Sequence, residues 1–472
     1  MNVIVHNEAN AEDNAMLQAL YSRSSKSVTE HLEKLKSTGS GKFMEQYYIG
    51  YGHASVGDLG TTTVYFEGIS MLAAKALQDN QLYNGQECSS RYIDFSNVEF
   101  RGGHIAPDCV VASMQEKLRT FYVKYMEPTK DWLKVKHPRL DSESESQYDK
   151  AIAARAFDIM RGFLPCGATT NVAWTGTLRN MKERLELLLH HPLVEVQDIA
   201  AEAYMELYAK YQHSFRADYA AAFDAAEGGM LHEHLLEIEG EELCNHLRRH
   251  DQFYTTIQVE FEDSPEYDAS SMAVKSQVGL DMDGLLDFPN RVWASATEHP
   301  KGFRPPRHSG AESEHVEARG LLDFGSFRDL QRHRGGYCSM PCVDPLEGFH
   351  SWYLTNLPIE AVVDAVELLD EIKSLDSKLI TADPTAEQRI LNQYFMPMGC
   401  LVPFTLKYSV SQAVYVAELR SGQTVHPTLR PVAQSMAKHL NQRGVVVNYD
   451  DRPDIWSTRR GGQDITEAKD TA

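Results

Sequence analysis

The chain of 472 residues carries 46 basic and 67 acidic side chains, which gives a formal net charge of −21. Such an excess of negative charge repels nucleic-acid polymers and acidic membrane surfaces, because binding to them depends on neutralising phosphates with Lys and Arg. No run approaches the roughly 20 apolar residues that a membrane span requires. The polar, acidic start Met1–Asp13 resembles neither a secretory signal nor a basic transit peptide. We therefore expect a cytoplasmic protein with no nucleic-acid or membrane partner.

The cysteines and histidines do not indicate a metal site. Seven cysteines are an odd number without paired spacing, which favours reduced thiols. His232 and His234 are two residues apart and would face away from each other on a helix. We expect no bound metal.

The first half shows helix and strand signals in a definite order. Ser27–Leu35 and Phe43–Tyr51 have helical patterns and lead into a glycine-rich turn. Thr61–Phe66 is rich in β-branched and aromatic residues, which is typical of a strand. Apolar residues then recur at helical spacing over 69–77, and the polar segment Asp79–Tyr92 follows.

Further helices are predicted before the middle of the chain. Ala151–Arg161 has a helical pattern that must stop before Pro165, since the residue preceding a proline disfavours the helical conformation. Apolar residues from Leu193 to Leu207 mark a long amphipathic helix.

The two halves repeat each other weakly. In the first half, a turn with His53 and Ser55 precedes a strand, a helix and a polar motif. In the second half, His308, Glu314 and His315 precede an apolar segment, a helix and the triplet Arg332-His333-Arg334. The motif Arg161–Pro165 is matched by Gln393–Pro397. The shared order indicates a duplication.

The duplication predicts two tandem domains, 1–228 and 229–458. Within the second domain, 263–300 reads as a loop or insertion because it is rich in Asp, Ser and Gly. The polar tail 459–472 is predicted to be disordered. We expect an α+β fold in which each copy has a twisted sheet flanked by long helices.

Two short motifs are candidates for chemistry. Arg332-His333-Arg334 follows a predicted helix, where cations are favoured by the helix dipole and two guanidiniums can also grip phosphate. Glu87-Cys-Ser89-Ser90-Arg91-Tyr92 would, if extended, project Glu87, Ser89 and Arg91 from one face. Each motif alone is equally compatible with a solvated helix end or a surface loop.

Together the two motifs resemble the signature of the flavin-dependent thymidylate synthases, the ThyX family. Family members carry an Arg-His-Arg triplet and a Glu-x-Ser-x-Arg-Tyr element in one copy. Here the first copy keeps Glu87, Ser89 and Arg91 but has Asp79-Asn80-Gln81 in place of the triplet. The second copy keeps the triplet and has lost the other element.

A later family motif is divided in the same way. In the ThyX family, which the chain resembles, an arginine stands four residues before a Leu-Pro proline and another stands about 23 residues after that proline. Arg161 fills the first position in the first copy, and Leu188 stands at the second. In the second copy, Gln393 replaces the first arginine and Arg420 fills the second position. Complementary losses predict one hybrid site built from both copies.

The resemblance implies reductive methylation of dUMP to dTMP with methylenetetrahydrofolate, FAD and NADPH. It implies that Arg161 and Arg420 are catalytic and stabilise negative charge on the uracil oxygens. Substrate binding is implied for Glu87, Ser89, Ser90, Arg91 and Arg332. Cofactor binding is implied for Arg332, His333, Arg334, His53, Ser55, His308, Glu314 and His315. One chain would form an intrachain pseudo-dimer, so a homodimer would match the tetramer of the family.

Other functions stay open. The family has a glutamine three residues before the triplet, and this chain has Asp329 there. A carboxylate near a substrate phosphate is unfavourable, so the substrate could be another pyrimidine nucleotide or the transferred group hydroxymethyl. A non-catalytic nucleotide-binding relative is the further alternative.

Overall fold

The structure is a computed structural model that describes residues 1–6, 10–22, 24, 26–51, 53–88, 94–102, 110–216, 258–261, 315–345, 347–383, 386–422, 424–442, 445 and 447–452. These residues form helices and two antiparallel sheets, in agreement with the predicted mixture of helix and sheet. The chain divides into two compact units. No described helix is both long and apolar enough to cross a membrane.

The first unit comprises Met1–Ala112, Cys166–Glu237 and Leu379–Phe395, as far as these residues are described. Its sheet has the order β1-β2-β4-β3, and all neighbours are antiparallel. The strands are β1 (Asn2–His6), β2 (Thr61–Ser70), β3 (Asn84–Glu87) and β4 (Thr169–Thr177). In β2, Thr62, Val64 and Phe66 are buried and alternate with more exposed residues, so one face of the strand packs into the core.

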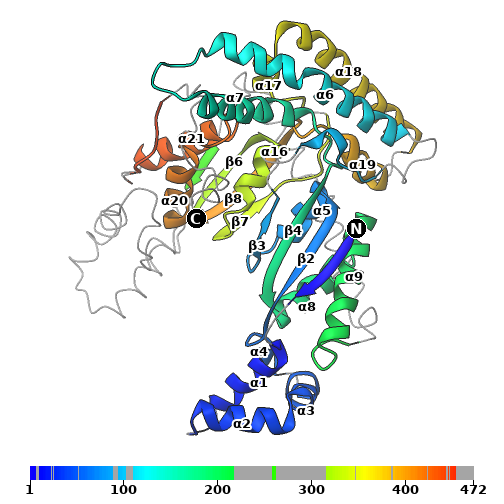
Figure 1. The fold of residues 1–472 in the computed structure, drawn as a ribbon, viewed down its shortest axis with the longest axis vertical. Helices are drawn as coiled ribbons and strands as arrows, with labels where there is room; N and C mark the ends of the chain where they lie inside the picture. The colour runs from blue at the N-terminus through cyan, green and yellow to red at the C-terminus, as the bar shows by residue number, and fades with distance from the viewer. Residues whose placement is uncertain are drawn as a thin grey trace. The chain divides into compact units, whose positions relative to one another are not determined.

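Helices surround this sheet. They are α1 (Ala11–Tyr21), α2 (Val28–Thr38), α3 (Gly41–Phe43), the π-helix η1 (Met44–Gly50), α4 (Ala54–Gly57), α5 (Met71–Gln78), α8 (Leu178–Leu188), α9 (Val194–Lys210) and α19 (Ala386–Asn392), with the 3-10 turns η2 (Phe95–Asn97) and η6 (Gln393–Phe395). The helices α1 to α4 gather at the end of the sheet where β2 begins, and α8 and α9 lie beside the sheet (Figure 1). Ser27 and Glu30 form a capping box that fixes the start of α2.

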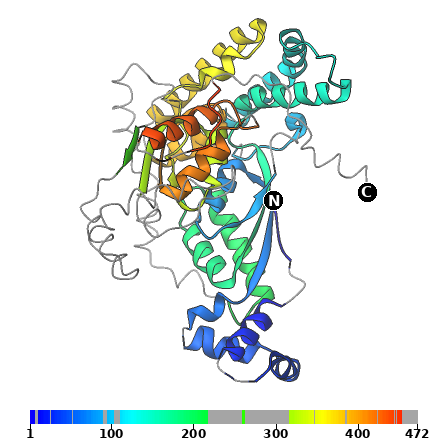
Figure 2. The same ribbon diagram turned by 90° about the vertical axis from the view of Figure 1, so that its left-hand side faces the viewer.

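The second unit comprises Ser113–Pro165, Ile238–Lys378 and Met396–Ala472, as far as described. Its sheet has the order β5-β6-β8-β7, the same arrangement in chain order as in the first unit. The strands are β5 (Gln258–Phe261), β6 (His315–Asp323), β7 (Gly336–Ser339) and β8 (Leu401–Ser409). Helix α16 (Phe324–Gln331) follows β6, α20 (Val410–Arg420) lies against β6 and β8, and α21 (Arg430–Gln442) packs on α20 (Figure 2).

Long helices complete the second unit. They are α6 (Val110–Lys136), which belongs to this unit from Ser113 onward, α7 (Glu145–Met160) with the 3-10 turn η4 (Arg161–Phe163), α17 (Ser351–Thr355) and α18 (Ile359–Ala382). Lys117 forms an ion pair with Glu371, and Lys124 Nζ lies 2.6 Å from Asp364 Oδ2. Tyr125 donates to the same carboxylate at 2.6 Å. Because partner numbers fall on α18 as they rise on α6, the two helices run antiparallel.

Each unit therefore contains a sheet from one half of the chain and helical segments from the other. In both units, an equivalent main-chain hydrogen bond joins the helical segment from one half of the chain to the half that forms the sheet. In the second unit, Gly399 N–H donates to the Gly162 carbonyl at 2.8 Å; in the first, Gly167 N–H donates to the Tyr394 carbonyl at 3.0 Å. A further matching pair of contacts is made by the isolated bridges Phe349 with Cys400 and Phe100 with Ala168.

The helix after the long strand is capped differently in the two units. Ser70 caps α5, and its N–H and hydroxyl donate to Glu195 at 2.8 and 2.6 Å. Asp323 caps α16 directly and accepts from Ser326 N–H at 2.9 Å. In both units a carboxylate lies at the helix N-terminus, where the helix dipole favours negative charge.

The residue that corresponds to Glu195 in the second half is Arg430. Each follows, by four residues, a histidine whose Nδ1 accepts a main-chain N–H two residues further on: His191 from Leu193, and His426 from Thr428. A glutamate at 430 would add a second negative charge to a half that already has Asp323 as its helix cap. The change to arginine avoids this.

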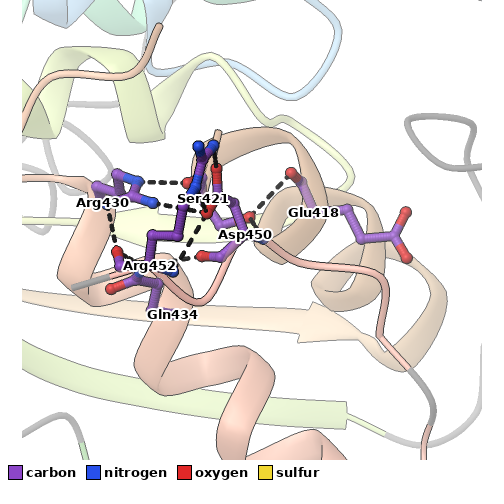
Figure 3. A network of polar contacts seen from close by, with 6 residues as sticks. All are labelled: Glu418, Ser421, Arg430, Gln434, Asp450 and Arg452. Atoms are coloured by element: carbon purple, nitrogen blue, oxygen red, sulfur yellow. Dashed lines mark hydrogen bonds and ion pairs between the residues drawn. The ribbon is translucent and has the colours of Figure 1, made fainter. Parts of the chain in front are cut away.

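Arg430 instead anchors the segment 447–452 to the end of α20 (Figure 3). Its Nε donates to the Ser421 carbonyl at 2.5 Å, its Nη1 donates to the Arg452 carbonyl at 2.7 Å, and its Nη2 lies 3.0 Å from Asp450 Oδ1. Gln434 donates to the carbonyls of Asp450 and Arg452 at 2.8 and 3.0 Å. A hydrogen bond from Arg452 and the charge of Arg430 outweigh burial and lower the pKa of Asp450 to about 2.

Most predicted elements are present, with shifted boundaries. The strand predicted over Thr61–Phe66 continues to Ser70, because Ser70 both ends β2 and caps α5. The polar segment Asp79–Tyr92 contains the strand β3. The domain boundary near 228, the insertion 263–300 and the tail 459–472 lie outside the described residues.

We predict that Arg430→Met lowers the free energy of unfolding by roughly 3–5 kcal/mol, because it leaves Asp450 without its buried cation and removes the donor to two carbonyls. Urea unfolding followed by circular dichroism measures this. Arg452→Met is the matched control: its side chain is 54% exposed, and its ion pair with the same carboxylate should contribute less than about 1 kcal/mol. Equal losses in the two variants would contradict the anchoring role of Arg430.

Candidate active site

Helix α16 of the second unit positions most of the charged residues singled out in the sequence. Asp323 caps its N-terminus, and its C-cap is Arg332, the first residue of the basic triplet. Arg328 and Asp329 lie on its last turn. Arg328 is 7% exposed, and Arg332 is exposed. The C-terminal end of this short helix thus carries Arg328, Asp329 and Arg332 close together.

Asp329 is the common neighbour of four arginines. Arg332 Nε lies 3.7 Å from its carboxylate, and Arg420 donates to its carbonyl at 2.8 Å. Its charge also acts on Arg161 and Arg328. Burial and the charge of Arg332 lower the pKa of Arg328 to about 10, against the opposing effect of Asp329. Asp329 thus holds Arg332 through its carboxylate and Arg420 through its carbonyl, and its charge acts on two further arginines.

Arg161 is a buried cation with several carboxylates near it. It is 4% exposed, and its Nη2 donates to Ser326 Oγ at 3.2 Å. Tyr353 donates to Asp323 Oδ2 at 2.8 Å. Burial would lower the pKa of Arg161, but Tyr353 and the carboxylates of Asp329, Asp158 and Asp323 together raise the pKa above its usual value. The guanidinium therefore stays charged in the core.

Ser326, which accepts from Arg161, also contacts two residues that directly precede α21. Ser326 Oγ lies 2.6 Å from Thr428 Oγ1 and 3.3 Å from His426 Nδ1. His426 Nε2 lies 3.1 Å from the Asp158 carbonyl, so this nitrogen carries the proton if it donates there. The network ties α16 to η4 and to the start of α21.

The middle residue of the basic triplet faces inward. His333 is 7% exposed, and its Nε2 accepts a hydrogen bond from Arg420 Nε at 2.7 Å. Accepting at Nε2 requires the neutral imidazole. His333 and the Asp329 carbonyl thus fix the plane of the Arg420 guanidinium from two sides. Arg334, the last residue of the triplet, is half-buried.

Other predicted site residues belong to the first unit. Glu87 is half-buried and accepts from Gln78 Nε2 at 2.8 Å. His53 and Ser55 are exposed at the start of α4. Ser89, Ser90, Arg91, His308 and Glu314 lie outside the described residues, and of His315 only the main chain, in β6, is described.

His53 adjoins an aromatic cluster formed by the π-helix η1. Ring centroids of Phe43 and Tyr47 are 4.7 Å apart, and those of Tyr47 and Tyr51 are 5.7 Å apart. The His53 ring lies 6.0 Å from Tyr51, which is 63% exposed. π-Helical turns often occur at functional sites. The sequence suggested a helix here but gave no sign of its π form or of the ring cluster.

Two arginines were missed from the sequence. Arg328 was not singled out because it lies inside a predicted helix, although it is one turn before Arg332 on the same face. Arg184 in α8 donates to the Ala76 carbonyl at 2.9 Å. In the first unit, Ala76 occupies the place that Asp329 has in the second, three residues before the helix position of Asp79. One turn earlier than Leu188, Arg184 therefore makes the contact that Arg420 makes in the second unit.

Comparisons with known proteins agree with the sequence motifs. Residues 2–211 match the model of the family described as thymidylate synthase complementing protein. This part of the chain is similar to that family, which agrees with the resemblance of the sequence motifs to the flavin-dependent thymidylate synthases.

Other relatives match both halves of the chain. UPF0159 proteins of Chlamydia muridarum and Chlamydia pneumoniae are 25% and 22% identical, cover 83% and 84% of this chain, and are themselves covered over 77% and 78%. One from Thermoplasma acidophilum is 20% identical over 91% of this chain and 92% of its own. A crystal structure of thymidylate synthase X from Helicobacter pylori with FAD and dUMP is 18% identical and covers 46% of this chain and 98% of its own, with a TM-score of 0.29.

We predict that Asp323→Asn lowers the free energy of unfolding by roughly 3–5 kcal/mol, because it leaves the buried Arg161 short of a carboxylate while preserving the helix cap. Urea unfolding gives the value. Asp370→Asn, on the exposed side of α18, should change stability by no more than about 0.5 kcal/mol. If Asp323→Asn behaves like this control, then Asp323 does not balance the charge of Arg161.

Proposed function

We propose that this chain is a flavin-dependent thymidylate synthase-like enzyme that methylates dUMP to dTMP, with methylenetetrahydrofolate as carbon donor and FAD reduced by NADPH. The site uses residues of both halves of the chain. The motif resemblance and the family match to residues 2–211 support the reaction class.

The observation that carries the proposal lies within the second unit. Arg161 comes from the first half of the sequence, and Arg332 and Arg420 come from the second, yet all three interact with Asp329. The family motifs divide the same arginines between the two copies. Their meeting at one helix supports a hybrid site and argues against independent decay of two sites.

The matching architecture supports the duplication on which the hybrid site depends. Both sheets have the same order of strands, and both exchanges of helical segments use an equivalent hydrogen bond from a glycine. The antiparallel pairing of α6 with α18 is compatible with an intrachain pseudo-dimer of two copies. Relatives that match more than four fifths of the chain support a shared two-part organisation.

The charge balance fits phosphate-bearing ligands such as dUMP and FAD. Arg332 is exposed and only loosely paired with Asp329, so it is free to turn its guanidinium toward a phosphate. Arg328, which is buried one turn earlier in α16, adds further positive charge. In the first unit, Asp79 stands where Arg332 stands in the second, and its charge acts on Arg184. That balance supports anion binding in the second unit.

When bound, the flavin would supply the hydride, and the chain would bind and orient the nucleotide and polarise its uracil ring. Arg420, held by His333 and the Asp329 carbonyl, is pre-oriented to stabilise negative charge that develops on a uracil oxygen. Arg161 contributes to the same field from a buried position. Glu87, Ser89, Ser90 and Arg91 would bind the nucleotide, while Arg334, His53, Ser55, His308, Glu314 and His315 would serve the cofactor.

Asp329 favours one second candidate, a different pyrimidine nucleotide or hydroxymethyl transfer. Its carboxylate is directed at Arg332 and weakens the pull of that residue on a phosphate. Assays with dCMP as the substrate test for a different nucleotide. Analysis of the nucleotide product for a hydroxymethyl or a methyl group separates hydroxymethyl transfer from methylation of dUMP.

We predict that purified chain binds FAD, that NADPH bleaches the flavin absorption, and that tritium is released from [5-³H]dUMP. Arg420→Lys should lower tritium release at least about 100-fold, because a lysine cannot keep the two-sided hydrogen bonding that orients the guanidinium. Arg389→Gln, an exposed residue of α19, is the control and should keep full activity. A colourless protein that ignores added FAD would contradict the proposed function.

We also predict that Tyr51→Ala weakens binding of a planar ligand at the cluster of Phe43, Tyr47, Tyr51 and His53 by about 1 kcal/mol, the contribution of one aromatic contact. Flavin fluorescence and folate titrations measure the affinities. Tyr21→Ala removes an equally exposed tyrosine, 59% against 63%, from another helix of the same unit and should leave both affinities unchanged. Identical behaviour of the two variants would exclude the cluster from ligand binding.

A further inference from the structure

The second unit buries a glutamine side chain that lacks hydrogen-bond partners. Gln412 is 1% exposed, and neither its Oε1 nor its Nε2 has a partner among the described residues. Its main chain is engaged, since its N–H donates to the capping Ser409 Oγ at 3.4 Å in the first turn of α20. An amide buried without partners is unfavourable, so this one is expected to gain partners in another state of the protein.

The amide lies directly against the residue that follows the basic triplet. A Cβ built on Gly335 would be 2.4 Å from Gln412 Oε1. Gly335 is exposed and is followed by Gly336. Main chain without a side chain therefore lies over the amide. Gly335 precedes the first residue of β7, Gly336, which is paired with Tyr408, and a glycine outside the strand re-orients at the lowest steric cost.

The first unit shows the same position in a satisfied form. Asn180 occupies the corresponding place in α8, where its N–H donates to the capping Thr177 Oγ1 at 3.1 Å. Its Oδ1 accepts from Asn80 Nδ2 at 3.3 Å. The residue of the second half that corresponds to Asn80 is His333, which is engaged with Arg420. Only one of these two corresponding amides is thus paired within the described chain.

The chemistry of the side chain limits what it can bind. A neutral amide has one donating and one accepting end, so its carbonyl would repel a phosphate that its NH₂ attracts. Its match is a flat edge with adjacent N–H and C=O groups. We propose that Gln412 recognises the N–H/C=O edge of a pyrimidine ring, in uracil or in flavin, when Gly335 moves aside. This inference rests on the proposed function and adds a specificity-determining residue to it.

Gln412 is well placed for that role. It lies two turns before Arg420 on α20 and contacts the loop that carries Arg334. A ring held by Gln412 would therefore lie near the arginines that are proposed to bind phosphate and to polarise the uracil oxygens.

The test compares full-length wild type with Gln412→Met, which keeps the shape and removes the amide. Titrations use FAD, dUMP and ADP as separate probes, and thermal unfolding is recorded without ligand. Gln412→Met should weaken binding of FAD or of dUMP about tenfold, because two neutral hydrogen bonds are lost, and should leave ADP unaffected. It should also raise the melting temperature of the ligand-free chain, since an unpaired buried amide is removed.

The control is Asn180→Leu, which breaks the existing hydrogen bond to Asn80 and should lower the melting temperature without changing any affinity. Weakened FAD binding alone assigns the flavin ring to Gln412, and weakened dUMP binding alone assigns uracil. Unchanged affinities, a loss confined to ADP, or a lowered melting temperature of Gln412→Met would overturn the inference and leave the proposed function standing. Wild type that binds neither FAD nor dUMP would overturn both.

Discussion

The charge balance at Asp329 is the constraint on which the second unit depends. Four guanidiniums interact with this residue, in a protein whose formal charge is −21. Buried charges must be paired or they destabilise the fold. The charges of Asp329, Asp158 and Asp323 act on the buried Arg161, and the Asp329 carboxylate also faces Arg332. The main-chain carbonyl of Asp329 holds Arg420, so one residue of α16 positions several arginines at once.

The two halves answer one structural requirement with different residues. A carboxylate is needed at the helix that follows the long strand, and Glu195 provides it beside Ser70 in the first unit. In the second unit the carboxylate comes from Asp323, which is the last residue of β6 and caps α16 directly. Arg430, at the position that corresponds to Glu195, instead holds 447–452 against α20. The two units thus place a carboxylate at the same location but take it from different positions in the sequence.

Local patterns in the sequence were sufficient for the strand at Thr61–Phe66, the helix ending before Pro165 and the basic triplet, because side-chain periodicity and proline act within a few residues. They could not show that His333 faces inward to hold Arg420, since that contact joins positions 87 residues apart in sequence. Nor could they find Arg184, whose partner carbonyl belongs to Ala76. The unpaired amide of Gln412 could not be predicted for the same reason, because Gly335, which lies against it, is close in space and distant in sequence. The resemblance to the family motifs did predict Arg161 and Arg420 as a divided pair, because those motifs combine residues that are distant in sequence.

The exchange of segments gives the divided motifs a physical basis. Arg161 ends α7, and α7 belongs to the compact unit whose sheet comes from the second half. Arg161 therefore lies in the unit of α16 and not in the unit of α5, while Gln393 is buried in the first unit. Under the proposed duplication, each position would be selected for the unit in which it lies, and complementary losses of arginine would be the expected result.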